Sequence, residues 1–209
     1  MRLTLNSILR KWNEEGFWGF FVALIVRIPG IKAFNIYQVY ALDLTDYPLS
    51  ETNFDKNVKL VRDIEHLNKQ AWFSDRLDIF KSRLSLNHRG IIYSESGMEV
   101  AYLWLDLSGK HREQRYGYSI PLKSDEAFYY DSFVIPARRG KGILRKLIWN
   151  AGIFAKNDLS RSKMLATIDI QNKISRRAHK NIGFKRMRTG VYVALKNRWE
   201  YKFITKGYR

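Results

Sequence analysis

The chain has 209 residues, of which 45% are hydrophobic and 14% aromatic, so it can bury a folded core and is not of the disordered class. It contains no cysteine, which excludes disulfides, thiolate metal ligands and a cysteine nucleophile. Its formal net charge is +17 at pH 7, and a field of that sign attracts nucleic acid, anionic membranes or phosphorylated ligands without selecting among them.

The most apolar run of the chain is FWGFFVALIV, at residues 17–26. It is about half as long as a membrane span requires. Glu14 and Glu15 interrupt its basic start and no small-residue cleavage site follows Arg27, which disfavours a signal peptide. Residues 1–32 are therefore predicted to form a basic amphipathic helix lying on an anionic membrane, with docking on the domain or burial in a homodimer as the alternatives. The expected location is cytoplasmic, with peripheral attachment to the inner face of the membrane as an option.

Residues 33–209 are predicted to form one mixed α/β domain with one crossover connection, between residues 126 and 170. Hydrophobic spacing and turn residues predict the following elements in chain order: a strand at 35–44, helices at 53–73 and 75–86, a hairpin of two strands turning at Ser96-Gly97, a long polar loop at 108–125, a strand at 126–136, a helix from 143 to about 156, a strand at 163–170, a short helix ending at Gly183, and two closing strands within 184–204.

The segment FVIPARRGKGILRKL, residues 133–147, joins a predicted strand to a predicted helix. A helix N-terminus has about four unpaired N–H groups and a partial positive charge, so it binds phosphate. Gly140 and Gly142 would let the backbone approach a pyrophosphate, and three basic residues add charge. The spacing is neither that of a Walker loop nor that of a Rossmann fingerprint. Taken alone, the segment is equally consistent with a basic turn.

Two motifs resemble those of the GCN5-related N-acetyltransferases. VIPARRGKGI is similar to the acyl-CoA pyrophosphate loop of that family, with the pattern running from Arg139 to Leu144, where Leu144 replaces the usual small residue. NKISRRAHKNIGF matches a second motif, in which Asn172 is followed across a short helix by Gly-Phe ending at Phe184. The resemblance covers roughly residues 35 to 209. It implies a mostly antiparallel central sheet flanked by helices.

The resemblance also implies acetyl-CoA, or another acyl-CoA, as the co-substrate. Backbone groups of Phe133, Val134 and Ile135 would hold the pantetheine arm, and Asn172 would contact it or the thioester. The residues expected around the pyrophosphate are Arg138, Arg139, Gly140, Lys141, Gly142, Ile143 and Leu144. No metal is expected, because the four histidines of the chain lack the spacing of metal ligands.

In such a reaction the acceptor amine attacks the thioester directly, without a covalent enzyme intermediate. His179 stands where the family often has a tyrosine that protonates the departing thiolate, and an imidazole can do the same work. The Ser175 hydroxyl or water is the alternative acid, and a surface position is the alternative for His179. Asp131 is the first candidate for the base that receives the amine proton, and Glu99 is the second. A salt bridge to an arginine is the alternative role for Asp131.

The acceptor is expected to be an amino sugar, linked to a nucleotide or a lipid, as in bacterial surface-polysaccharide assembly. The predicted loop at 108–125 is where such a pocket would form, and its basic and aromatic residues suit a phosphorylated acceptor: His111, Arg112, Arg115, Tyr116, Tyr118 and Lys123. A peptide or protein amine is the rival acceptor. A non-catalytic binder of nucleic acid or membrane on the same scaffold is the third interpretation.

Overall fold

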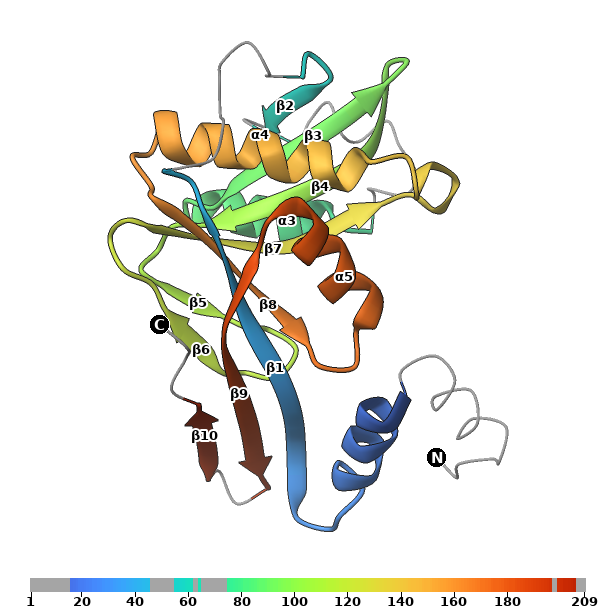
Figure 1. Cartoon of the computed structure of the whole chain (residues 1–209), viewed down its shortest axis with the longest axis vertical. Helices are drawn as coiled ribbons and strands as arrows, with labels where there is room; N and C mark the ends of the chain where they lie inside the picture. The colour runs from blue at the N-terminus through green and yellow to red at the C-terminus, as the bar shows by residue number, and fades with distance from the viewer. Residues whose placement is uncertain (1–15, 46–54, 62–63, 65–74, 197–198, 206–209) are drawn as a thin grey trace. The chain divides into compact units, whose positions relative to one another are not determined.

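The computed structural model describes residues 16–45, 55–61, 64, 75–196 and 199–205 (Figure 1). The chain divides into two compact units. The first consists of Met1–Ala41, Arg112–Tyr118 and Ala166–Arg209, and the second of Leu42–His111 and Ser119–Leu165. No helix in the described part of the chain is long and apolar enough to span a membrane.

The first unit is built on antiparallel strands β1 (Ile31–Asp43), β9 (Lys185–Leu195) and β10 (Glu200–Ile204), in the order β10-β9-β1-β8. Its part of β8 (Lys163–Asp169) leads into helix α5 (Lys173–Ile182). Residues 16–25 are also helical. The side chains Phe21, Val22 and Ile25 of that helix pack against Phe34, Ile36 and Ile170, so the apolar N-terminal run contributes to the core of this unit.

The second unit has the strand order β8-β7-β4-β3-β2. Its strands are β2 (Val58–Val61), β3 (Arg89–Glu95), β4 (Met98–Asp106) and β7 (Glu126–Val134), and β7 runs parallel to the start of β8 while the other neighbours are antiparallel. Helix α3 (Leu77–Ser85) packs on β3, and helix α4 (Ile143–Asn157) packs on β3, β4 and β7 (Figure 1). The crossover β7-α4-β8 is the one predicted from the sequence.

Strand alternation assigns the side chains of this sheet to two faces. Tyr102 and Trp104 of β4 are buried, and their rings meet Phe80 of α3 with centroids 5.0 Å apart. On the opposite face Tyr93 of β3 accepts a hydrogen bond from Lys146 Nζ of α4 at 3.3 Å. Helix α3 thus covers one face of the sheet and helix α4 covers the other. Strand β4 lies between the two helices and is almost wholly apolar because both of its faces are buried.

The structure confirms the predicted fold class, a mixed α/β fold with a mostly antiparallel sheet flanked by helices. It also confirms the hairpin of β3 and β4, whose turn residues Ser96 and Gly97 have φ of +51° and +79°, as a two-residue hairpin turn requires. The predicted helix at 143–156 and the helix that ends at Gly183 are present as α4 and α5.

Two predicted elements are wrong. Residues 58–61 of the helix predicted at 53–73 form strand β2, which pairs with Gly90–Tyr93, and most of the rest of that prediction lies outside the described residues. Val58 and Val61 are the buried residues at the two ends of this four-residue strand, so they are three positions apart. Residues on one face of a helix have the same separation, and for that reason the sequence pattern predicted a helix. The loop predicted at 108–125 contains strands β5 (Lys110–Arg112) and β6 (Ser119–Pro121), which pair with each other.

Candidate active site

The segment between β7 and α4 is a glycine-containing turn that leads directly into a helix. A 3-10 turn, η3 (Pro136–Arg138), is followed by Gly140 and Gly142, whose φ values of +77° and +76° favour glycine. Gly142 precedes α4 without a side-chain cap. The first helical hydrogen bond runs from the Lys146 N–H to the Gly142 carbonyl oxygen at 3.1 Å, so the N–H groups of residues 143–145 precede the helical ladder, as at the N-terminus of any helix.

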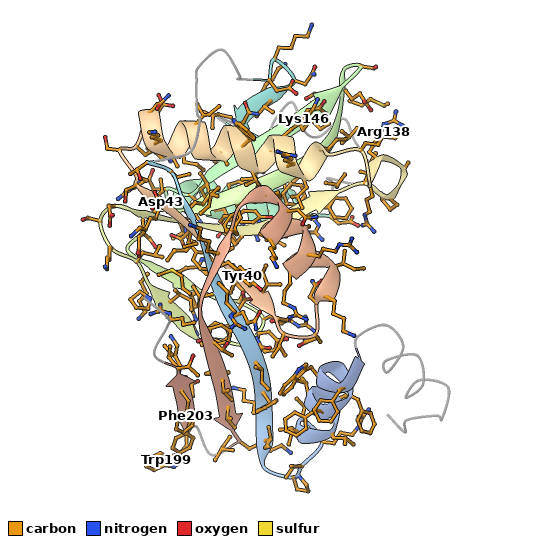
Figure 2. The ribbon with its side chains drawn as sticks, in the orientation of Figure 1. Tyr40, Asp43, Arg138, Lys146, Trp199 and Phe203 are labelled. Carbon is orange, nitrogen blue, oxygen red and sulfur yellow. The ribbon has the colours of Figure 1, made fainter. Side chains whose placement is uncertain are left out.

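The charge around this turn is positive. The first turn of α4 contains no acidic residue, and Lys141 and Arg145 flank it. Arg138 forms an ion pair with Glu95, and Lys146 lies 3.0 Å from Asp55; both basic side chains are labelled in Figure 2. The Arg139 Nε donates to the Val134 carbonyl oxygen at 3.0 Å, and its guanidinium lies over the Phe133 ring.

Strand β7 carries a β-bulge at Asp131. Tyr130 stands opposite Trp104 and Phe133 opposite Tyr102, so two residues of β7 face one residue of β4. Asp131 has φ of +42°, a left-handed conformation that aspartate tolerates better than most residues. Because the bulge breaks the alternation of β7, it turns the Asp131 side chain toward α3.

The salt bridge considered as the alternative for Asp131 is present. The Arg83 Nη1 lies 2.5 Å from Asp131 Oδ2, and the Arg76 Nη1 lies 3.6 Å from Oδ1. The Tyr102 hydroxyl donates to the same carboxylate at 3.4 Å. Burial, together with the Asp131 charge, raises the pKa of Tyr102 to about 12, so this hydroxyl stays protonated. The Arg83 side chain is 7% exposed and Asp131 is 28% exposed, so the carboxylate is the solvent-facing end of the pair.

Glu99, the second candidate base, lies near the turn of the β3-β4 hairpin, where it pairs with Ser94. A register shift interrupts the alternation of β4 between Glu99 and Ala101, because Ala101 stands opposite Tyr93 and Glu99 stands opposite the next residue of β3, Ser94.

The second motif forms a capped helix in the first unit. The Asn172 side chain accepts a hydrogen bond from the Ser175 N–H at 3.0 Å at the start of α5, and Gly183 ends the helix with φ of +115°. His179 is 4% exposed and packs edge-on against Phe184, so it is buried and not a surface residue. Burial lowers the pKa of His179, opposed by its hydrogen bond to the Ser175 carbonyl oxygen at 2.7 Å.

The candidate acceptor residues of segment 108–125 belong to both units. Arg115 and Tyr116 line a cavity of the first unit. Tyr118 is buried and stacks on Tyr37 with ring centroids 4.4 Å apart. Arg112 and Lys123 are exposed.

His111 is not exposed but part of a buried cluster in the second unit. Its Nδ1 donates to Asp106 Oδ2 at 2.8 Å, and His88 Nε2 lies 3.5 Å from Oδ1 of the same carboxylate. Burial alone would raise the pKa of Asp106, but the hydrogen bonds from His111 and Ser108 lower it to about 2. Among the residues that the structure describes, no group of three or more His, Asp or Glu side chains is arranged to hold a metal ion.

Sequence reasoning missed the cavity and its carboxylate. The cavity has a volume of about 420 Å³ and is lined by the helix at 16–25, by Phe34, by Arg115 and Tyr116, and by Asp169 with residues 171–174. Asp169 ends β8 and accepts hydrogen bonds from Asn35 Nδ2 at 2.9 Å and the Tyr116 hydroxyl at 3.1 Å. The sequence offered one signal for this residue: Asp169 is the one acidic residue in the largely apolar run MLATIDI, at residues 164–170.

The chain matches no protein-family model, and no curated protein matches it. Among solved structures, a GNAT-family protein from Novosphingobium aromaticivorans aligns with a TM-score of 0.50 and 11% identity over 86% of this chain and 67% of that chain. A GCN5-related N-acetyltransferase from Sphaerobacter thermophilus aligns with a TM-score of 0.51 and 12% identity over 99% of this chain and 59% of that chain.

A third structure is the GCN5-related glucosamine N-acetyltransferase region of a fungal multi-domain beta-N-acetylglucosaminidase, with a TM-score of 0.50 and 16% identity over 76% of this chain and 20% of that chain. The chain thus spans less than two thirds of the bacterial N-acetyltransferase and a fifth of the fungal protein. At these identities the likeness establishes the fold, which is that of the GCN5-related N-acetyltransferases.

Proposed function

We propose that the protein is an acyl-CoA-dependent N-acyltransferase that uses acetyl-CoA. The observation that carries the proposal is the uncapped N-terminus of α4 behind Gly140 and Gly142, on a fold whose members include acetyltransferases. Backbone N–H groups and the helix dipole at that position suit the pyrophosphate of coenzyme A. Lys141 and Arg145 supply further positive charge beside it.

The proposed reaction needs no covalent enzyme intermediate. The lone pair of the neutral acceptor amine attacks the thioester carbonyl carbon, the C–S bond breaks, the nitrogen loses a proton and the CoA thiolate gains one. The enzyme has to hold the two reactants in line and exchange these protons with solvent. A chain without cysteine is suited to this direct transfer.

In the second unit, we assign the pantetheine arm to the backbone of Phe133, Val134 and Ile135. The Val134 carbonyl oxygen accepts a hydrogen bond from Arg139 Nε. A pantetheine amide that uses this oxygen would therefore displace the Arg139 side chain, which is then free to bind a phosphate. Asp131 is the proposed base, and its pairing with Arg83 makes anchoring of the acceptor ammonium the alternative role.

In the first unit, Asn172 is the proposed contact for the pantetheine or thioester, and Ser175 and His179 are the candidate acids. A neutral imidazole whose Nδ1 proton is donated to the Ser175 carbonyl has only an acceptor at Nε2. It has to bind a second proton before it can donate one from there, and burial disfavours that charge. This geometry favours the Ser175 hydroxyl or water as the acid.

For the acceptor we propose an amino sugar linked to a nucleotide or a lipid. Arg115 and Tyr116 in the wall of the cavity suit a phosphorylated ligand, and the fungal region of the same fold is described as a glucosamine N-acetyltransferase. A peptide or protein amine is the second candidate. The non-catalytic binder remains the third, supported by the net charge of +17.

We further propose peripheral contact with the inner face of an anionic membrane, with a homodimer contact as the alternative use of the same surface. Ile28, Trp199 and Phe203 are 49%, 61% and 63% exposed, and Figure 2 labels the two aromatic residues, of which Trp199 precedes β10 and Phe203 belongs to it. The Lys196 N–H donates to the Gly30 carbonyl at 2.8 Å, so the turn after the N-terminal helix adjoins the β9-β10 turn. Aromatic and basic side chains together are typical of membrane-surface segments.

The proposed function is tested by titrating the full chain with acetyl-CoA in a calorimeter. We expect saturable binding with a dissociation constant in the micromolar range, about −8 kcal/mol. Release of the free thiol of CoA in the presence of an amine then tests turnover. Absence of acetyl-CoA binding would reject the proposal, and binding of duplex DNA without any acetyl-CoA turnover would favour the non-catalytic alternative.

A further inference from the structure

The cavity of the first unit has the size and lining of a small-molecule site. Its volume of about 420 Å³ lies within the range of ligand pockets. One wall is apolar and consists of Val22, Ala23, Val26 and Phe34. The other wall is polar and consists of Arg115, Tyr116, Asp169, Gln171, Asn172 and Lys173.

Among the described residues, the side chains that hydrogen bond to Asp169 are neutral donors. Asn35 is fully buried, and its Nδ2 donates to Asp169 Oδ1 at 2.9 Å. The Tyr116 hydroxyl donates to Oδ2 at 3.1 Å. Burial and the Asp169 charge raise the pKa of Tyr116, so this hydroxyl remains a donor. The carboxylate is therefore oriented by two hydrogen bonds that carry no positive charge.

In the part of the chain that the structure describes, the cation that forms an ion pair with Asp169 is Arg115, and it is a weak partner. The Arg115 Nη1 lies 3.7 Å from Asp169 Oδ2, and the Arg115 side chain is 74% exposed. An exposed pair of that length contributes little, because solvent screens it. The Asp169 carboxylate, whose side chain is 24% exposed, can therefore accept a cation brought by a ligand.

The other charged residues that line the cavity determine which kind of cationic ligand can bind beside Asp169. Arg115 and Lys173 line the same space as Asp169, so a ligand with only a positive charge would meet two cations and one carboxylate. A ligand that carries an anionic group as well as an ammonium matches both signs. The Oε1 atom of Gln171, a residue that also lines the cavity, is buried without a hydrogen-bond donor among the described residues, and a ligand N–H or O–H would satisfy it.

We infer that this cavity is the acceptor site and that it binds a primary amine that also carries a phosphate or carboxylate group. Asp169 holds the ammonium on entry, Arg115 and Lys173 hold the anionic group, and the apolar wall accepts the remainder of the molecule. Asn172 lines the same cavity and is the residue proposed to contact the pantetheine or thioester. The inference rests on the proposed N-acyltransferase function and narrows its acceptor class.

The test uses the full chain saturated with coenzyme A and two matched pairs of amines. L-leucine is compared with 3-methylbutylamine, which lacks the carboxylate, and glucosamine 6-phosphate is compared with glucosamine, which lacks the phosphate. We expect the anionic member of at least one pair to bind ten-fold or more tightly than its partner in calorimetry. The pair that shows the difference identifies a carboxylate or a phosphate as the anionic group.

Two variants then test the named residues. Asp169→Asn should weaken the tighter amine ten-fold or more, and Arg115→Ala should remove most of the preference for the anionic member. Arg115 is largely exposed, so its replacement tests the inference even where Asp169→Asn lowers stability. Asp158→Asn, which changes an exposed acid at the end of α4, is the control and should change neither affinity.

The outcomes of these measurements distinguish a failure of the acceptor site from a failure of the proposed N-acyltransferase function. Absence of coenzyme A binding in the native protein contradicts the acyltransferase function itself. Coenzyme A binding with no saturable amine binding, with equal binding within both pairs, or with full affinity in both Asp169→Asn and Arg115→Ala overturns the acceptor-site inference alone.

Discussion

The Nδ1 atom of His179 lies 2.7 Å from the carbonyl oxygen of Ser175, one helical turn earlier in α5. A carbonyl oxygen only accepts, so this ring nitrogen carries the proton of the neutral imidazole. The ring is buried against Phe184, and burial lowers its pKa below the ordinary value of about 6.5. His179 is thus a neutral, hydrogen-bonded core residue at neutral pH.

The lowered pKa of His179 predicts a pH-dependent stability. The unfolded chain binds a proton near pH 6.5 and the folded chain does so only at lower pH, so stability falls as the pH drops below about 6.5. His179→Gln should reduce this loss. Thermal unfolding between pH 5 and 8 measures it. We also expect His179→Gln to retain turnover within about ten-fold; a larger loss in kcat, with the acidic limb of its pH profile removed, would establish His179 as the acid.

Gly142→Glu should strongly weaken acetyl-CoA binding. The substitution places a carboxylate at the N-terminus of α4 and a side chain on a residue with φ of +76°, so both charge and backbone geometry oppose the pyrophosphate. Calorimetry should show at least a hundred-fold weaker binding. Gly109→Glu is the matched control, because Gly109 also has positive φ and open space where a Cβ would lie. Equal weakening in both variants would show that strain alone is responsible.

The Asp131–Arg83 pair predicts separate effects on stability and turnover. Asp131→Asn leaves the buried Arg83 guanidinium without its carboxylate and should lower the free energy of unfolding by about 3 kcal/mol. Arg83→Met combined with Asp131→Asn should recover much of that loss, as denaturant unfolding can measure. If Asp131 is the base, the double variant stays inactive despite its restored stability. Turnover that returns with stability would assign Asp131 a structural role.

Asp106 should stabilise the fold at all but very acidic pH. Its pKa is lowered to about 2 from an unfolded value near 3.9, so its contribution is present above about pH 4 and is lost as the pH falls toward 2. Asp106→Asn should cost about 1–3 kcal/mol at pH 7, because His111 and Ser108 lose a charged acceptor. Urea unfolding at pH 7 and pH 3 checks both statements; an equal cost at the two pH values would contradict them.

Membrane contact is tested by sedimentation with vesicles of pure phosphatidylcholine and vesicles containing 30% phosphatidylserine. We expect pelleting only with the anionic vesicles, weakened by salt. Trp199→Ser with Phe203→Ser should reduce it several-fold, because both rings are exposed. Ile174→Ser, which removes an 86% exposed apolar side chain from α5, is the control. If the double variant pellets as the native chain does, β10 has no part in membrane contact.

Local patterns in the sequence were enough to predict those helices and strands whose ends depend on residues at or next to the end itself. Ser96 and Gly97 close a tight hairpin turn, Gly142 and Asn172 begin helices, and Gly183 ends one, because each of these conformations depends on the residue's own backbone preferences. The glycine-containing turn before α4 was predictable for the same reason. So was the fold class, which follows from the order of the elements.

Only the tertiary structure decided which side chains meet across the chain. Val58 and Val61 form a strand because β3 offers them a partner, which helical spacing alone did not reveal. Asn35 and Asp169 are hydrogen bonded across 134 positions, and Arg83 and Asp131 are paired across 48. No local preference encodes such contacts, since they depend on strand order and on the bulge in β7. The sequence by itself determined the turns and helix ends, whereas burial and long-range pairing determined which of its charged residues line a cavity and which are paired in the core.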